Sequence, residues 1–220
     1  MTLRRALVVA DDLGYDPAID AGILEAHRDG VVTATSALVD GPFAEAALAT
    51  APRSLAVGLH LRLPPDVGSA GAEAEIRRQL QRFAAVRGAS PAHVDGHRHV
   101  HAEPAVLEAL LRVTAPLGLR VRALDEGMRD RIRAAGGRAC DGFLGDAALR
   151  PCWTPERLAV AVRALPPGTS EVMMHPGHAP SHVVTGFGPE REIELAAAVA
   201  PGVRRAFREA GVLLCGVLPE

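Results

Sequence analysis

The sequence predicts a single α/β domain, residues 1–220, whose parallel strands form a closed or nearly closed barrel. Three observations support this prediction. Short apolar runs recur along the chain, and they lack the polar alternation of a half-exposed strand. Amphipathic stretches with helical spacing separate these runs. Seven or eight such strand–helix units follow one another without a linker or an internal repeat, as parallel strands joined by right-handed crossovers require.

Strands and helices are expected to alternate from the first residues onward. The run RALVVA (5–10) predicts a fully buried strand, and Asp16 and Pro17 begin a helix because Asp caps its end and Pro suits its first position. Gly30 ends that helix. Further strands are predicted at 32–39, 55–61, 92–97, 119–123, 141–144, 171–175 and 211–217, and further helices at 43–50, at 72–87, from Pro104 to Gly118, from Pro155 and in the region up to about 210.

Composition narrows the class of protein. The formal charge is −2, so no basic field suggests a nucleic-acid partner. All the basic residues are Arg, and Lys and Asn are absent, so the abundance of Arg reflects composition and not phosphate recognition. The first apolar run stops at Asp11, too early for a secretory signal, and no stretch approaches the roughly 20 apolar residues of a membrane span. Three cysteines leave no complete disulfide set, which predicts a cytoplasmic protein.

Acidic residues and histidines follow several of the predicted strands. The carboxyl ends of parallel barrel strands meet at one rim, where reacting groups gather. Carboxylate and imidazole together suit zinc, cobalt, nickel or iron(II), and one Asp with two His is the ligand count of a catalytic site with open positions. The residues concerned are Asp11 and Asp12 after the first strand, His60 after the third, Asp95, His97 and His99 at the fourth, and His175 after the strand 171–175.

His97, His99 and His101 alternate with other residues. On a strand they would point to one side, with Asp95 leading the same row. This pattern does not decide whether His97 or His99 is the ligand. Taken alone, an acidic pair is more often a turn or a helix cap, and a single His at a strand end is more often a hydrogen-bonded core residue. Four strand ends carrying such groups together favour a site.

Several strings of residues resemble one family. ADDLGYDPAIDAGILEAHRDGVVTATSALVDGPFAEAA, VGLHL, PAHVDGHRHVH and MMHPG occur in the order found in the YdjC-like carbohydrate deacetylases, which look like relatives of the polysaccharide deacetylases. The resemblance covers nearly the whole chain. It implies a distorted (β/α) barrel that holds one divalent metal ion (zinc, magnesium, cobalt or similar). The implied reaction is removal of acetyl from an acetylated amino sugar by metal-activated water, and the implied assembly is a homodimer.

The resemblance also implies roles for single residues. Asp12, His60 and His97 correspond to the metal ligands, and Asp11 to the catalytic base. His175 would act as an acid or an electrostatic stabiliser. Asp95 or His99 would orient a ligand from behind or contact the substrate.

The chain departs from the family pattern at several positions. Val9 and Leu13 flank the acidic pair where Asn and Phe are usual, Gly96 replaces Ser, and Arg98 replaces Gln or His. The segment after His60 is short. Because loops at this rim select the substrate, these departures bear on the identity of the sugar more than on the chemistry. Two other functions stay open: hydrolysis of another amide or ester, or metal and sugar binding without catalysis. The presence of Asp11 argues against the latter.

Overall fold

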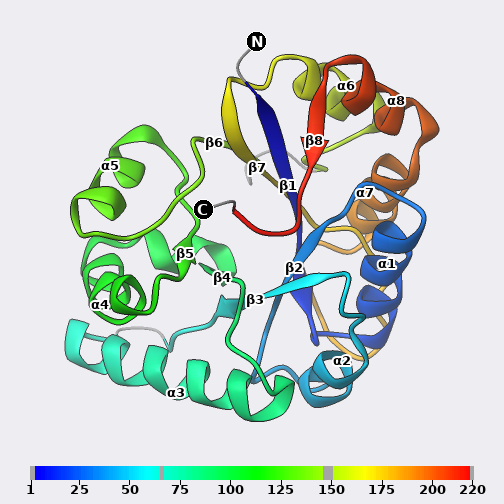
Figure 1. Ribbon diagram of the computed structural model, residues 1–220. Coiled ribbons are helices and arrows are strands. Elements are labelled where there is room, and N and C mark those ends of the chain that lie inside the picture. The colour runs from blue at the N-terminus through cyan, green and yellow to red at the C-terminus, as the bar shows by residue number, and fades with distance from the viewer. Residues whose placement is uncertain (1–2, 65–66, 146–150, 219–220) are drawn as a thin grey trace.

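The computed structural model describes residues 3–64, 67–145 and 151–218, and its centre is one curved sheet of parallel strands surrounded by helices (Figure 1). The strand order is β5-β4-β3-β2-β1-β7-β6, and β8 also pairs with β1. The strands are β1 (Arg4–Leu13), β2 (Ala34–Ala37), β3 (Ala56–Leu61), β4 (His93–Gly96), β5 (Arg120–Val121), β6 (Gly142–Leu144), β7 (Gly168–Met174) and β8 (Val212–Leu214).

The longest strand, β1, organises the sheet. One of its edges pairs with β7 over seven residues beginning at Arg4. The other edge is shared, because β8 pairs with its first residues and β2 with its last ones. At the ends of the sheet, an isolated parallel bridge joins Arg120 of β5 to Arg138, which precedes β6. The two edges therefore approach each other, and the predicted nearly closed barrel of parallel strands is confirmed.

Eight α-helices cover the outside of the sheet in the described part of the chain (Figure 1). They bury apolar faces, as α1 does with Ile19, Ile23 and Ala26. Only α5 has no counterpart among the expected helices, since its nine residues bury just Met128 and Ile132. The helices are α1 (Pro17–Arg28), α2 (Ala44–Thr50), α3 (Ser69–Arg87), α4 (Pro104–Thr114), α5 (Glu126–Ala134), α6 (Pro155–Arg163), α7 (Pro189–Val199) and α8 (Pro201–Glu209).

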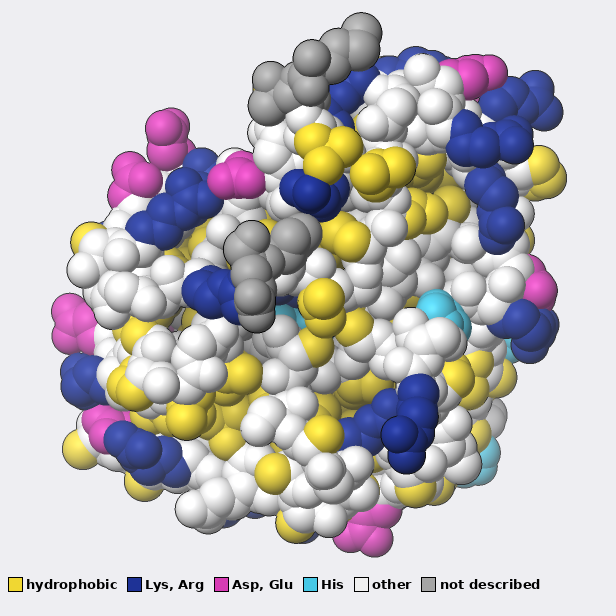
Figure 2. All heavy atoms as spheres, viewed as in Figure 1, with side chains coloured by type: hydrophobic (Ala, Val, Ile, Leu, Met, Phe, Trp, Pro, Cys, Tyr) yellow, Lys and Arg dark blue, Asp and Glu magenta, His cyan; other side chains and the backbone are white. Residues whose placement is uncertain are grey.

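Two features of the surface bear on possible partners. On the face in Figure 2, Arg side chains and acidic side chains are interspersed with apolar ones, in keeping with the formal charge of −2. None of the helices in the described ranges is both long enough and apolar enough to cross a lipid bilayer.

The interior of the barrel is unusually polar. A small apolar cluster of Leu7, Val9, Ala34 and Cys140 occupies part of it. The interior also holds charged side chains that are completely buried and that pair with one another. Buried charges persist only where they are paired and hydrogen-bonded. This paired interior supports the groups at the carboxyl rim. Its charged members are Asp11, Asp95, Arg120, Arg122 and Glu171.

Candidate metal and catalytic site

One cleft of about 570 Å³ gathers most of the predicted site residues at the carboxyl ends of the strands. Small-molecule sites typically have volumes of this order. Asp95 lies fully buried beneath the cleft, beside His60, with which it is in register across β3 and β4. The predicted residues that line the cleft are Asp11, Asp12, His60, His97, His99 and His175.

A local distortion of β1 brings two adjacent aspartates to the same site. Successive side chains of a regular strand point to opposite faces. Between Ala10 and Leu13 the register of β1 shifts, and Asp12 has a φ of 79°, which is rare for a residue other than glycine. This conformation lets Asp11 and Asp12 both face the cleft. Strained backbone of this kind is concentrated at functional sites.

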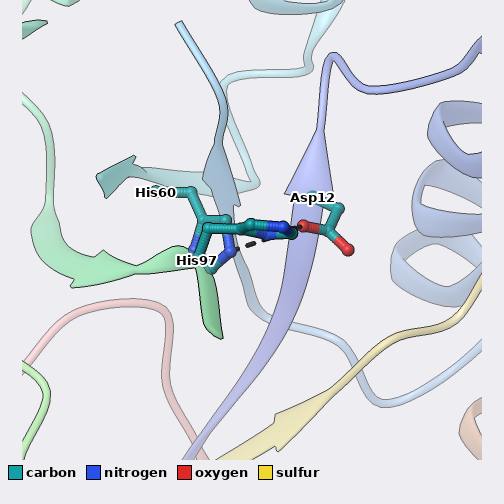
Figure 3. Close-up of side chains that lie close together, drawn as sticks. All are labelled: Asp12, His60 and His97. Atoms are coloured by element: carbon teal, nitrogen blue, oxygen red, sulfur yellow. Dashed lines mark hydrogen bonds and ion pairs between the residues drawn. The ribbon is translucent and has the colours of Figure 1, made fainter. Parts of the chain in front are cut away.

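Asp12, His60 and His97 converge on one point (Figure 3). The Oδ1 atom of Asp12 is 3.2 Å from Nδ1 of His97 and 3.4 Å from Nε2 of His60. The other oxygen, Oδ2, accepts a hydrogen bond of 2.5 Å from Nη2 of Arg191. Burial alone would raise the pKa of Asp12, but hydrogen bonds from His60 and His97 and the charge of Arg191 hold it well below its usual value.

This donor set fits a divalent cation. One carboxylate oxygen and two imidazole nitrogens come from three different elements, and the cleft leaves the remaining coordination positions open. Nδ1 of His60 is 2.7 Å from Oδ1 of Asp95, which leaves Nε2 directed toward Asp12. Such carboxylate–histidine pairs commonly fix the ring of a metal ligand.

The charge of His60 is set by its acidic neighbours. Burial would lower its pKa, but the carboxylates of Asp95 and Asp11 outweigh burial and raise the pKa to about 10. The imidazole therefore carries a proton at neutral pH when no metal is bound. A cation held at Nε2 would take the place of that proton.

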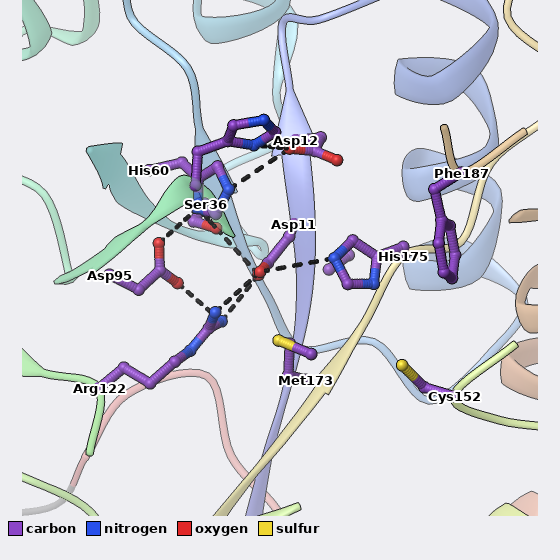
Figure 4. A network of polar contacts seen from close by, with 12 residues as sticks. Asp11, Asp12, Ser36, His60, Asp95, Arg122, Cys152, Met173, His175 and Phe187 are labelled. Carbon is purple, nitrogen blue, oxygen red and sulfur yellow. Dashed lines mark hydrogen bonds and ion pairs between the residues drawn. The ribbon is translucent and has the colours of Figure 1, made fainter. Parts of the chain in front are cut away.

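Asp11 is held by a buried arginine (Figure 4). Nη1 and Nη2 of Arg122 donate to its two oxygens at 2.8 and 2.7 Å, and the Ser36 hydroxyl donates at 3.1 Å. Burial raises the pKa of Asp11, but the guanidinium outweighs burial, so that the pKa lies below its usual value. Nε2 of His175 is 4.0 Å from Oδ2 of Asp11. An ionised carboxylate thus lies between the three-residue group and an imidazole.

A second set of possible ligands includes Asp11, His60 and Asp95. The guanidinium of Arg122 contacts both of these aspartates, at 2.7 Å in each case. A metal ion among them would meet this positive charge at short range. The group of Asp12, His60 and His97 is therefore the better cation site.

The predicted row of histidines on one strand face is wrong. The chain leaves the sheet at Gly96 and forms a 3₁₀ turn, η1 (His97–Ala102), in which Arg98 and His99 have left-handed φ values of 53° and 57°. His97 joins Asp12, and His99 packs edge-on against Phe143. His101 is buried. Its ring nitrogens have no hydrogen-bond partner among the described residues.

Sequence reasoning missed several residues that support the site. The general abundance of arginine in the sequence hides the roles of Arg122 and Arg191. A signal did exist, because Arg120 and Arg122 fall inside the predicted strand 119–123, where a charge must be paired. The sequence also suggests no role for Glu194, which lies one turn after Arg191 on the buried face of α7.

Comparisons with known proteins identify the family of the chain. The family model described as YdjC-like protein matches residues 5–70 and 66–209. The chain is 31% identical over 290 residues to a carbohydrate deacetylase of Mus musculus (97% of this chain, 94% of that protein). It is 30% identical over 252 residues to a chitooligosaccharide deacetylase of Serratia marcescens (96% and 98%). A crystal structure from Enterococcus faecalis V583 shares the fold, with a TM-score of 0.87, 24% identity and 97% coverage of both chains. Since the family model spans most of its length, the chain belongs to the YdjC-like protein family.

Proposed function

We propose that this protein is a divalent-metal-dependent carbohydrate deacetylase that removes the N-acetyl group from an acetylated amino sugar. The observation that carries the proposal is the convergence of Asp12, His60 and His97 beside the ionised Asp11 in one cleft. The relatives described as carbohydrate deacetylase and chitooligosaccharide deacetylase support the substrate class. The cytoplasmic location and the homodimer remain predictions.

The metal ion would be held by Oδ1 of Asp12, Nε2 of His60 and Nδ1 of His97. Two imidazoles favour zinc or cobalt over magnesium, which prefers oxygen ligands. When bound, such an ion polarises water and the acetyl carbonyl oxygen. Arg191 holds the free oxygen of Asp12, and Asp95 holds the ring of His60. These two contacts fix the ligands before the ion arrives.

Two residues would move protons during the reaction. Asp11 accepts a proton at its carboxylate from the water that attacks the acetyl carbon, and Arg122 keeps it ionised for that step. His175 donates a proton from Nε2 to the amide nitrogen, which leaves as an amine. The ring of Phe187, with its centroid 4.8 Å away, limits the positions of this imidazole. His99, which lines the cleft, would contact the substrate.

The test is acetate release from N-acetylated mono- and oligosaccharides, with zinc, cobalt and magnesium supplied in turn and metal content measured separately. Asp11→Asn is expected to keep the metal and lose most activity, and His97→Ala to lose both. Asp29→Asn, an exposed carboxylate at the end of α1, is the matched control and should change neither.

Three results would contradict parts of the proposal. Equal metal loss in the Asp11 and His97 variants would reverse the assignments of base and ligand. Release of acetate from O-acetyl but not N-acetyl sugars would identify an esterase. A protein that binds metal and sugar but never releases acetate would be a binding protein.

A further inference from the structure

A second group of metal-ligating side chains adjoins the cleft on the far side of His175. It consists of Cys152, which precedes α6, His175, which follows β7, and Glu194 of α7. One potential ligand atom from each residue lies within 4.8 Å of the others. In Figure 4 one ring nitrogen of His175 faces Asp11, while the other ring nitrogen lies on the side of Cys152.

Glu194 is the organising residue of this cluster. It is completely buried, and its two oxygens accept the backbone N–H groups of Cys152 at 2.8 Å and His175 at 2.7 Å. A carboxylate has about four lone-pair positions, so these two bonds leave acceptor capacity. No salt bridge neutralises Glu194 within the described ranges, since Arg191 pairs with Asp12 instead. Burial of a carboxylate without a counter-charge is costly, and a bound cation would offset this cost.

His175 offers an unused nitrogen to the same place. Its Nε2 is the atom that faces Asp11, at 4.0 Å. Its Nδ1 is buried and has no hydrogen-bond partner in the described structure. Buried polar nitrogens are nearly always satisfied, so this atom points to a missing partner. Among the described residues, the cluster therefore presents a carboxylate without a salt-bridge partner and an imidazole nitrogen without a hydrogen-bond partner, next to a thiol.

We propose that Sγ of Cys152, Nδ1 of His175 and a carboxylate oxygen of Glu194 bind a second cation of the zinc class. Thiolate, imidazole and carboxylate are all zinc ligands, and the soft sulfur disfavours magnesium and calcium. Bonds to zinc are about 2.0 to 2.3 Å long, so modest side-chain rotations would bring the three atoms into coordination. Cys152 binds as the thiolate and releases its proton to solvent, whereas the imidazole binds as the neutral ring.

Occupation of this second site has a consequence that rests on the proposed function. A cation on Nδ1 prevents His175 from carrying protons on both ring nitrogens. The ring then has no readily donated proton at Nε2 for the departing nitrogen. Zinc in excess of one equivalent is therefore expected to lower acetate release by about 10²-fold, the order that a positioned proton donor contributes. Excess magnesium should not do so.

Cobalt titration of the metal-free, full-length protein tests the site directly, because thiolate bound to Co²⁺ gives a characteristic near-ultraviolet charge-transfer absorption. Native protein should bind two equivalents and show this absorption. Cys152→Ser should bind one equivalent without it, and His97→Ala should keep the thiolate absorption while losing the other equivalent. Cys215→Ser is the matched control, since this thiol donates to the carbonyl oxygen of Ala6 near the opposite end of β1.

Folding of each variant is checked by circular dichroism, with Cys152→Ala as the alternative to the serine variant. The proposal is overturned if native protein shows no thiolate absorption, or if the absorption persists in both Cys152 variants. The ratio of acetate release at excess zinc to that at one equivalent should be far below one in native protein and near one in Cys152→Ser. Thiolate absorption without any acetate release would uphold the second site and reject the deacetylase function. Acetate release without thiolate absorption would uphold the deacetylase function and reject the second site.

Discussion

Arg122 and Asp11 form a completely buried bidentate ion pair, with the two nitrogen–oxygen distances at 2.8 and 2.7 Å. The same guanidinium contacts Asp95 at 2.7 Å and Glu171 at 2.5 Å. A planar guanidinium can bond several carboxylates at once, which an ammonium cannot do with the same geometry. The proposed base therefore takes its charge state from the interior of the barrel and not from solvent.

The first prediction concerns the pH dependence of activity. In the native protein Arg122 lowers the pKa of Asp11 against the effect of burial. Arg122→Lys keeps a positive charge but loses the bidentate contact, so this pKa should rise. Because the base must be ionised, the acidic limb of kcat/KM should move to higher pH, and activity at pH 6 should fall more than activity at pH 8. Arg112→Lys, at an exposed pair with Glu73, is the control. An acidic limb that stays in place would contradict the role of Arg122.

The second prediction concerns metal affinity. Arg191 bonds both Asp12, through Nη2, and the carbonyl oxygen of Phe187, through Nε. A lysine at this position can make only one of these contacts, so Asp12 should lose its fixed orientation. We expect Arg191→Lys to weaken metal binding by about 10- to 100-fold, as measured by competition with a chromophoric chelator. Arg204→Lys on α8, where the guanidinium bonds exposed carbonyl groups, should leave affinity unchanged.

The convergence of the candidate residues in one cleft could be predicted from the sequence because it depends on topology. Parallel strands bring their carboxyl ends to one rim whatever the details of packing. The residues at the carboxyl ends of β1, β3, β4 and β7 therefore approach one another. Asp11 and His175, which are separated by most of the chain, lie 4.0 Å apart for this reason.

Other features depend on interactions that no local pattern records. The alternation of His97, His99 and His101 predicted a row on one strand face, but β4 ends at Gly96. An added Cβ at Gly96 would lie 2.9 Å from a ring nitrogen of His101, so the turn folds back closely onto the end of its own strand. Arg122 and Glu194 matter because of partners far away in sequence. The position of Arg122 inside a predicted strand indicates that it is buried, but no local pattern identifies the carboxylates with which it pairs.

The third prediction concerns stability in acid. Burial and the charge of Arg122 lower the pKa of His101 from 6.5 to about 3. The unfolded chain therefore binds a proton between these pH values that the folded protein does not, and stability falls as the pH falls below about 6.5. His101→Leu should remove this pH dependence, which lowers the free energy of unfolding by about 2 kcal/mol at pH 5. Urea unfolding at pH 7 and pH 5 measures it. Equal slopes in native protein and variant would show that His101 does not contribute.

The last prediction tests how the wall of the cleft is anchored. The segment that carries Thr185 and Phe187 follows β7 and is bound to the start of α1: Asp16 accepts the backbone N–H groups of Ser181 and His182, at 3.1 and 2.8 Å. An added Cβ at Gly22 of α1 would lie 2.5 Å from the Cα atom of Gly177 in this segment.

Gly22→Ala should therefore displace the segment, lower the free energy of unfolding by about 1–3 kcal/mol and raise KM, because Phe187 would move away from His175. Gly202→Ala is the matched control. Apart from its chain neighbours and the adjacent backbone of α8, no atom of the described residues lies within 4 Å of a Cβ at that position, so stability should stay the same or rise by up to about 1 kcal/mol through helix propensity. If Gly22→Ala lowers stability but leaves KM unchanged, the segment is anchored at α1 without shaping the substrate site. If neither quantity changes, the close contact between α1 and Gly177 is not part of the folded protein in solution.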